Sequence, residues 1–280
     1  MANSINKALT VEDRITAVIL AIQGHSVDKK QVVVVEGDDD VLFYERFLDM
    51  SNCDVIVNNS CYGYTDISST CNANGYAKRY FMIKDSDFDR LLGAAQVDNQ
   101  MITDFHDREL FLSMLDADAI LGGKYGVGID VKSIAMDIRG LSMTKWYNMA
   151  NDCKLAFRRQ CVVSKLYDGQ NEVSVDDCIA KLANEKKNEG KQIPGKSEVA
   201  GFMDSNEAAD WRQYTNGHDW LQAIANWLNI RLNKTISYKT ELHPYLESLF
   251  SEENFQETDL YSEIRKREEN IGRKLIKVAA

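Results

Sequence analysis

Residues 32–40 read VVVVEGDDD, four β-branched residues followed by acidic residues and a glycine. A β-branched run with no polar face is typical of a strand that is buried on both sides, as in the middle of a parallel sheet. Gly37 turns the chain, and the three aspartates after it favour a helix N-terminus, where the helix dipole is positive. The stretch therefore predicts a buried strand that ends at Glu36, followed by a helix whose apolar residues are Val41, Leu42, Phe47 and Leu48.

The flanking sequence repeats these two kinds of element. Thr10 and Asp13 have the spacing of a capping box, and apolar residues then recur at helical spacing as far as Gly24. Strands are also predicted at residues 54–57, 80–83 and 100–103, with a polar connection at 58–75 and a helix through Leu115. Strands that alternate with helices need crossover connections. The sequence therefore predicts an α/β, Rossmann-like fold with a mostly parallel sheet flanked by helices.

Helical patterns dominate the second half of the chain. Residues 218–232 carry one apolar stripe, which we interpret as core packing, formed by Leu221, Ile224, Trp227 and Leu228. A glycine cluster at residues 122–128 indicates a domain boundary. We predict a catalytic domain at residues 1–128 with an N-terminal helix, and a mainly α-helical C-terminal domain at residues 129–280.

The charge balance bears on the partner. A net charge of −10 argues against bulk electrostatic capture of nucleic acid, because such capture depends on Lys and Arg neutralising phosphates. A local basic strip can coexist with an acidic remainder. The candidates are Lys154 with Arg158 and Arg159, and the tail residues Arg265, Lys266, Arg267, Arg273, Lys274 and Lys277.

Cysteine spacing and hydropathy bear on the compartment. The six cysteines include no CxxC pair and match neither a zinc site nor a compact disulfide framework, so we predict free thiols. No apolar run reaches about 18 residues, and the first residues lack the order of a signal peptide. The expectation is a soluble, cytoplasmic protein with no membrane association.

Acidic side chains follow two of the predicted strands. Glu36 follows the valine run, and Asp85 and Asp87 follow the strand at residues 80–83 in the sequence YFMIKDSDFD (80–89). Ligands of parallel sheets bind beyond the carboxyl ends of the strands. Carboxylates that meet there repel one another unless a cation lies between them, and hard oxygen ligands suit Mg²⁺ or Mn²⁺. Since such an ion can promote attack on a phosphodiester, we predict that Glu36, Asp85 and Asp87 are catalytic metal ligands.

Other known acidic motifs fit these residues less well. An EF-hand calcium loop fails at its sixth and twelfth positions, which are Arg90 and Gln96. An aspartyl phosphatase leaves Glu36 without a role. A receiver domain ranks below the metal site because its first strand ends in a directly acidic pair. Taken singly, Asp38, Asp39 and Asp89 fit helix capping or solvent exposure.

Residues 34–40 (VVEGDDD) and 81–87 (FMIKDSD) together resemble the Toprim signature, a strand-terminal Glu-Gly followed by Asp-x-Asp after a later strand. Toprim domains occur in topoisomerases, bacterial primases, recombination proteins and the overcoming-lysogenization-defect nucleases. Residues 103–110 (TDFHDREL) and 217–219 (GHD) are similar to segments of standalone Toprim proteins paired with an ATPase in anti-phage defence. The nuclease effector subunit of PARIS-type systems is the member that the chain resembles first.

The resemblance implies a metal-dependent endonuclease that cuts tRNA as the toxic effector of an abortive-infection system and is held by an ABC/AAA-type ATPase. It implies Mg²⁺ or Mn²⁺ on Glu36, Asp85 and Asp87, with Glu36 as ligand or general base, and a homodimer. The accessory residues it implies are Asp40, Asp89 and Glu109 around the metal site, and His106 and His218 at the phosphate or in proton transfer. Two alternatives stay open: a nuclease that cuts or nicks DNA, and a non-catalytic, regulated binding subunit of an ATPase complex.

Overall fold

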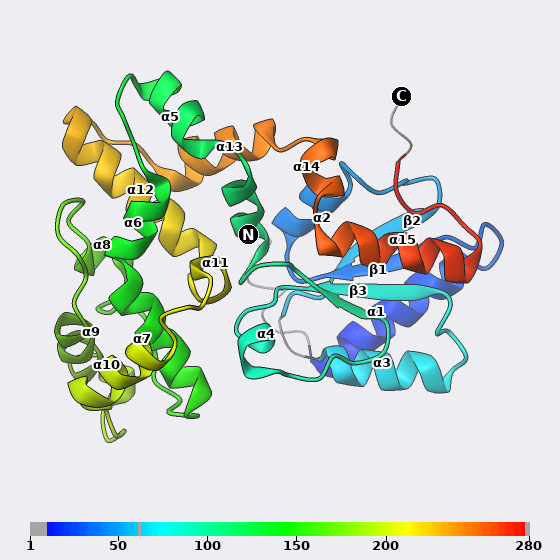
Figure 1. Cartoon of the computed structure of the whole chain (residues 1–280). Helices are drawn as coiled ribbons and strands as arrows, with labels where there is room; N and C mark the ends of the chain where they lie inside the picture. The colour runs from blue at the N-terminus through cyan, green and yellow to red at the C-terminus, as the bar shows by residue number, and fades with distance from the viewer. Residues whose placement is uncertain (1–9, 61–62, 278–280) are drawn as a thin grey trace. The chain divides into compact units, whose positions relative to one another are not determined.

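A four-stranded parallel sheet organises the first half of the chain in this computed structural model, which describes residues 10–60 and 63–277. The strands are β1 (Gln31–Val35), β2 (Cys53–Val57), β3 (Tyr80–Lys84) and β4 (Gln100–Ile102), in the order β2-β1-β3-β4. Val34 pairs with Ile56 on one side and with Met82 on the other. All five residues of β1 are buried, as the valine run predicts. The α/β class with a parallel sheet flanked by helices is confirmed (Figure 1).

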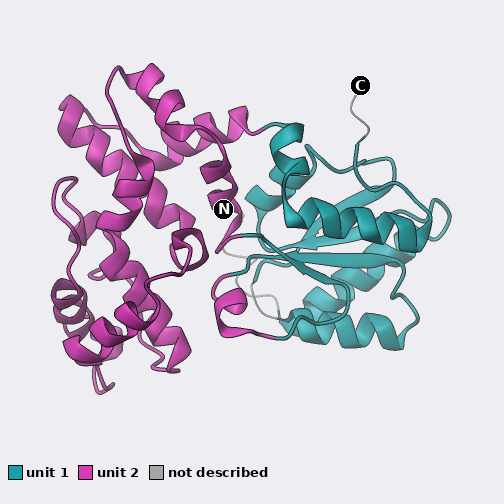
Figure 2. Cartoon of the chain, viewed as in Figure 1, with its two compact units in different colours: residues 1–86, 95–104, 251–280 teal, residues 87–94, 105–250 magenta. Residues whose placement is uncertain are grey.

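The chain divides into two units, coloured teal and magenta in Figure 2. Unit 1 contains residues 1–86, 95–104 and 251–280. Besides the sheet it holds α1 (Val11–Gly24), α2 (Asp38–Tyr44), α3 (Tyr64–Ala73), α14 (Glu252–Gln256) and α15 (Asp259–Ile271).

Unit 2 contains residues 87–94 and 105–250 and is helical. Its elements are α4 (Asp89–Leu92), the 3₁₀ helix η3 (Arg108–Met114), α5 (Ala117–Tyr125), α6 (Val131–Asp137), α7 (Arg139–Ala150), α8 (Val163–Leu166), α9 (Val175–Ala183), the 3₁₀ turn η4 (Lys186–Asn188), α10 (Lys196–Ser205), α11 (Trp211–Tyr214), α12 (Gly217–Leu232), the π-helix η5 (Tyr238–Leu242) and α13 (His243–Leu249).

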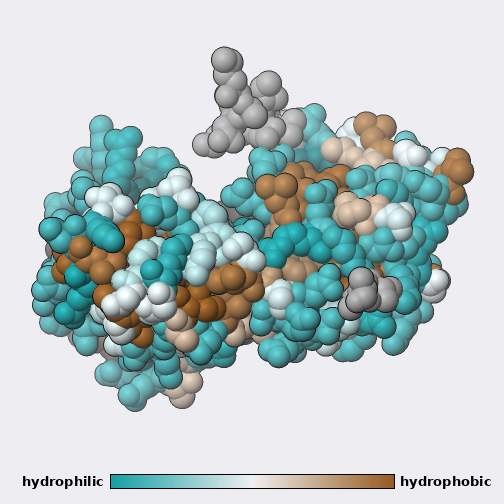
Figure 3. Space-filling view, turned by 90° about the horizontal axis from the view of Figure 1, so that it is seen from above, coloured by the Kyte–Doolittle hydropathy of each residue, from teal (hydrophilic) through white to brown (hydrophobic). Residues whose placement is uncertain are grey.

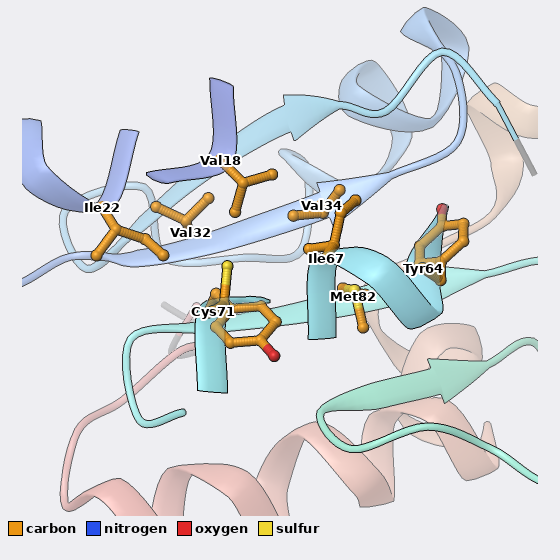
Figure 4. Packing of buried hydrophobic residues seen from close by; sticks show 9 residues of the cluster. Val18, Ile22, Val32, Val34, Tyr64, Ile67, Cys71 and Met82 are labelled. Carbon is orange, nitrogen blue, oxygen red and sulfur yellow. The ribbon is translucent and has the colours of Figure 1, made fainter. Parts of the chain in front are cut away.

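Helices α1 and α3 cover one face of the sheet. Thr10 caps α1 in the predicted capping box with Asp13. Val18 and Ile22 of α1 then pack with Ile67 of α3 against side chains that point to this face, Val32, Val34, Tyr80 and Met82 (Figure 4). This core fixes β1 and β3 side by side.

Helix α15 packs on the opposite face, to which Phe81 points because side chains alternate along a strand. The guanidinium of Arg267 lies 5.4 Å from the centre of the Phe81 ring. It also donates hydrogen bonds to Gln31 and Asn99, and burial lowers its pKa to about 10. Asp104 accepts the backbone N–H groups of Asp259 and Leu260 at the start of this helix. Residues 251–280 therefore complete the sheet unit, although the sequence assigns them to the helical domain.

Helix α3 lies inside the polar stretch 58–75, where no helix was predicted. Ser, Thr and Asn are weak helix formers, and the stretch contains several of them. The buried residues Tyr64, Ile67, Ser68 and Cys71 nevertheless follow helical spacing, and that pattern was the available indication.

The apolar stripe of α12 is core, as predicted. Leu221, Ile224 and Leu228 are fully buried, whereas Trp227 is half-buried beneath the guanidinium of Arg231. The helix expected through Leu115 is the 3₁₀ helix η3. The glycines at 122 and 123 lie inside α5, and the long segment of the helical unit covers residues 105–250 in place of the predicted 129–280.

The surface carries separate apolar residues. Seen from above, hydrophilic residues cover most of the visible face, with hydrophobic ones in patches between them (Figure 3). None of the helices described is long and apolar enough to cross a bilayer. Five cysteines within the described ranges are free thiols, as predicted, and Cys61 lies outside them.

Candidate functional site

Glu36 and Asp85 lie at the carboxyl ends of neighbouring parallel strands. Glu36 directly follows β1 and Asp85 directly follows β3, and these two strands are hydrogen-bonded to each other. The backbone N–H of Asp85 donates to Oε1 of Glu36 at 3.1 Å. Both residues are partly exposed. The fold thus brings together two of the three residues that the sequence predicts as metal ligands.

Asp87 comes two residues after Asp85 and is the first residue of unit 2. Its φ of 46° is in the left-handed region, which Asp tolerates better than most residues. Its backbone N–H donates to the carbonyl of His106 at 2.5 Å. Between the two aspartates, the N–H of buried Ser86 donates to the Thr103 hydroxyl at 2.9 Å. Hydrogen bonds from the backbone N–H groups of Ser86 and Asp87 therefore fix the turn after β3.

The remaining acids near Glu36 and Asp85 in the sequence have local structural roles. Oδ2 of Asp40 accepts the backbone N–H of Gly37 at 2.9 Å, which closes the turn between β1 and α2. Asp38 and Asp39 are exposed in the first turn of α2, and Asp89 begins α4. Asp40 thus supports the Glu36 loop from its position in the helix.

The pair Glu36 and Asp85 has the donor chemistry that a small divalent cation requires. Mg²⁺ takes oxygen ligands and commonly binds through one or two carboxylates while it keeps several waters. Within residues 10–60 and 63–277, no group of three or more His, Cys, Asp or Glu side chains is arranged to hold a metal ion. The residues therefore fit an ion that is bound by two carboxylates and by water or substrate oxygens.

A second cluster of ionisable residues lies in unit 2, around the start of α12. His106 and Asp107 are both buried, and Nδ1 of His106 lies 3.3 Å from Oδ2 of Asp107. The same carboxylate oxygen accepts the backbone N–H of Gly217 at 2.7 Å. Burial by itself would raise the pKa of Asp107, but the contacts with His106 and Gly217 outweigh it and the pKa is lowered. Asp107 is therefore the anion that holds the helix start.

Glu109 lies in the same cluster. It is 7% exposed, and burial raises its pKa even though Arg108 donates to its Oε1 at 3.0 Å. Nε2 of His218 lies 3.9 Å from this oxygen, and the His218 side chain is about half exposed. Glu109 and His218, predicted as accessory residues, therefore meet, and His106 is a buried neighbour.

Arg108 connects this cluster to α13. Its guanidinium is 2% exposed and donates to Oε2 of Glu247 at 2.9 Å, and Nε2 of His243 lies 3.0 Å from the same oxygen. Burial would raise the pKa of Glu247, but His243 and Arg108 lower it to about 2. Four members of this cluster were not predicted as site residues: Asp107, Arg108, Glu247 and His243. The run of three charged residues at 107–109, next to apolar residues 110–112, was the only local indication.

The structure places the two predicted basic strips in different surroundings. Most tail cations make contacts within unit 1: Arg267 as described, Arg265 with Glu268, Arg273 with the carbonyls of Asp28 and Lys29, and Lys277 with those of Glu45 and Arg46. These contacts hold α15 and the residues after it, so the tail is not a basic strip as predicted. Arg158 and Arg159 are exposed, and Lys154 pairs with Asp152 at 3.2 Å.

No protein-family model, no curated protein and no solved structure matches the chain. The resemblance to Toprim nucleases rests on the motifs at Glu36, Asp85 and Asp87 and stays a prediction.

Proposed function

We propose that this protein is a divalent-metal-dependent endonuclease that hydrolyses a nucleic-acid phosphodiester. The observation that carries the proposal is the placement of Glu36 and Asp85 at the ends of adjacent parallel strands, joined by the 3.1 Å hydrogen bond. Ligand sites of parallel sheets lie at this edge. The Asp-x-Asp motif that continues to Asp87 adds a third carboxylate by sequence.

The carboxylates of Glu36 and Asp85 would hold Mg²⁺ or Mn²⁺, and Asp87 belongs to the proposal only through the sequence motif. When bound, the ion neutralises charge at the phosphodiester and lowers the pKa of water. The residues around the site hold Glu36 and Asp85 in position. Buried β1 and the Asp40 contact with Gly37 fix Glu36, while the Ser86 and Thr103 contact fixes the turn that carries Asp85.

The finer assignment follows the resemblance. We propose RNA, and tRNA in particular, as the substrate, and a cytoplasmic role as the toxic effector of an anti-phage system that an ABC/AAA-type ATPase holds inactive. A homodimer belongs to the same proposal. Sequencing of cellular RNA ends after induction tests the substrate, since a tRNA nuclease leaves ends at defined tRNA positions.

The decisive experiment measures cleavage by the purified full-length chain. Labelled tRNA, an unstructured RNA and duplex DNA are incubated with Mg²⁺, Mn²⁺ or EDTA. We expect metal-dependent cleavage that falls on the order of 10²-fold or more in Glu36→Gln, since loss of one ligand weakens both metal binding and its orientation. Gln keeps an oxygen that can accept the Asp85 N–H, so the strand ends stay joined.

The matched control is Asp39→Asn, which removes the same charge three residues away on an exposed side chain. It should cleave at the wild-type rate. Equal activity of Glu36→Gln and the wild type would reject the proposal. Metal binding without cleavage of any of the three substrates would favour the regulated binding subunit.

A further inference from the structure

Unit 2 contains a groove of about 380 Å³ whose lining is dominated by cations. Arg158 and Arg159 come from the segment before α8, and Lys186 and Lys187 from η4. The one acidic side chain in the lining belongs to Glu185. The lining thus has a net charge of about three positive charges in a chain whose net charge is −10.

Buried side chains hold the two cationic segments together. Asn188 is 3% exposed; its Oδ1 accepts the N–H of Ala156 at 2.7 Å, and its Nδ2 donates to the carbonyls of Ala156 and Leu182. The Glu185 carboxylate, which is also buried, accepts the N–H of Gln160 at 3.4 Å. Buried polar side chains therefore connect the segment that carries Arg158 and Arg159 to the segment that carries Lys186 and Lys187. The groove between the two segments is preorganised.

The four cations carry like charges, and Glu185 is the one acidic side chain that lines the groove with them. All four are exposed, and within the described ranges none of them forms an ion pair. Lys186 and Lys187 follow the C-terminus of α9, where the helix dipole favours positive charge, but this does not account for the two arginines on the other wall. A fixed cluster of like charges is stabilised by an anion that several of them contact at once.

The composition of the groove identifies the kind of anion. Its lining contains no aromatic or aliphatic side chain, whereas the cores of protein interfaces are anchored by such residues. Without aromatic platforms it also lacks the means to stack single-stranded bases. Guanidinium groups match phosphate oxygens in pairs, and lysines add point charges. These features fit the phosphate backbone of a nucleic-acid helix, contacted without reading its sequence.

We propose that the groove between Arg158, Arg159, Lys186 and Lys187 binds the phosphodiester backbone of double-helical nucleic acid. This deepens the proposed function, on which it rests for its biological meaning, by assigning substrate capture to the helical unit. Such a location reconciles an acidic chain with a nucleic-acid substrate.

Binding is measured by fluorescence anisotropy with the full-length chain carrying Glu36→Gln, in EDTA, so that no cleavage occurs. The probes are a short RNA duplex, the DNA duplex of the same sequence and one single strand of the RNA. We expect both duplexes to bind more tightly than the single strand. Replacing all four groove cations by Gln should weaken duplex binding on the order of 10²-fold and reduce the slope of log K against log salt by about 3.6, or about 0.9 for each cation.

The control variant replaces four exposed lysines outside the groove, Lys78, Lys234, Lys239 and Lys266, by Gln, which changes the net charge equally. It should retain the wild-type slope. Equal weakening by both variants, or absence of duplex binding, would overturn the proposal. Tight binding of an acidic peptide without duplex binding would also overturn it and would assign the groove to a protein partner.

The two proposals can fail separately. Cleavage that survives Glu36→Gln rejects the metal site and leaves the binding result standing. If the groove variant binds metal like the wild type but its duplex binding depends less on salt, the groove binds nucleic acid independently of the metal site.

Discussion

Oδ2 of Asp107 accepts the backbone N–H of Gly217 at 2.7 Å, so the first residue of α12 is fixed on the segment that precedes η3. A Cβ at Gly217 would lie 2.4 Å from Oδ1 of Asp107 and 2.5 Å from Cβ of Glu109. No side chain larger than hydrogen fits without displacing this segment. The glycine of the Gly-His-Asp sequence is therefore required because a side chain at this position would collide with Asp107 and Glu109.

Gly217→Ala should therefore destabilise the protein by about 1–3 kcal/mol, the usual cost of overpacking a buried site. Gly201 in α10 is the matched control, because a Cβ there meets nothing within 4 Å. Gly201→Ala should raise stability by about 0.5–1 kcal/mol through better helix propensity. Urea denaturation measures both, and equal stability of the two variants would contradict the packing argument.

Glu247 should make stability depend on pH. Its pKa is lowered in the folded protein from the ordinary 4.5 to about 2. The stabilisation is therefore complete above pH 4.5 and is lost as the pH falls toward 2, over a span worth roughly 3 kcal/mol at most.

Glu247→Gln should lower stability at neutral pH and lose less than the wild type on acidification. Exposed Glu172→Gln is the control and should follow the wild-type curve. Denaturation curves between neutral pH and pH 3 test this. A variant whose curve runs parallel to that of the wild type would show that the ion pair does not carry the pH effect.

Asp85→Asn should weaken metal binding and leave the fold intact. The contact with Glu36 uses the backbone N–H of Asp85, so the substitution keeps it. Calorimetric titration with Mn²⁺ should show about a tenfold or greater loss of affinity. Mn²⁺ should also raise the melting temperature of the wild type more than that of Asp85→Asn, because ligands stabilise the state that binds them. Wild-type affinity in the variant would remove Asp85 from the ligand set.

Arg267→Ala should destabilise unit 1 by about 3 kcal/mol, because it leaves Gln31, Asn99 and the Tyr80 carbonyl without their charged donor. Its neighbour Lys266 is exposed, so Lys266→Ala should change stability by less than about 0.5 kcal/mol. The comparison is made by thermal and urea denaturation. Equal effects would mean that α15 contributes little to the sheet unit.

The sequence predicted what depends on neighbours along the chain. The valines of β1, the apolar strand before Asp85 and the stripe of α12 are local patterns, and each forms the element expected from it. The position of Glu36 and Asp85 at strand ends was predicted in the same way, whereas the pairing of β1 with β3, which brings the two residues into contact, was not predictable from the sequence.

The sequence could not predict contacts between distant segments. Arg267 belongs to a charged helix whose sequence suggests a solvated strip, yet it contacts strand residues about 190 positions earlier. Arg108 and Glu247 are likewise far apart in the chain, and neither has a local pattern that marks it as buried. Such pairings are fixed by tertiary packing, which overrides local propensity.

The route of the chain has a consequence for synthesis in the cell. The polypeptide passes from one unit to the other four times, at residues 86, 94, 104 and 250. Because α15 and its Arg267 contacts follow the helical unit in the sequence, a nascent chain cannot cover the Phe81 face of the sheet until residues 105–250 have been made. That face of the sheet therefore lacks its covering helix while the helical unit is being synthesised.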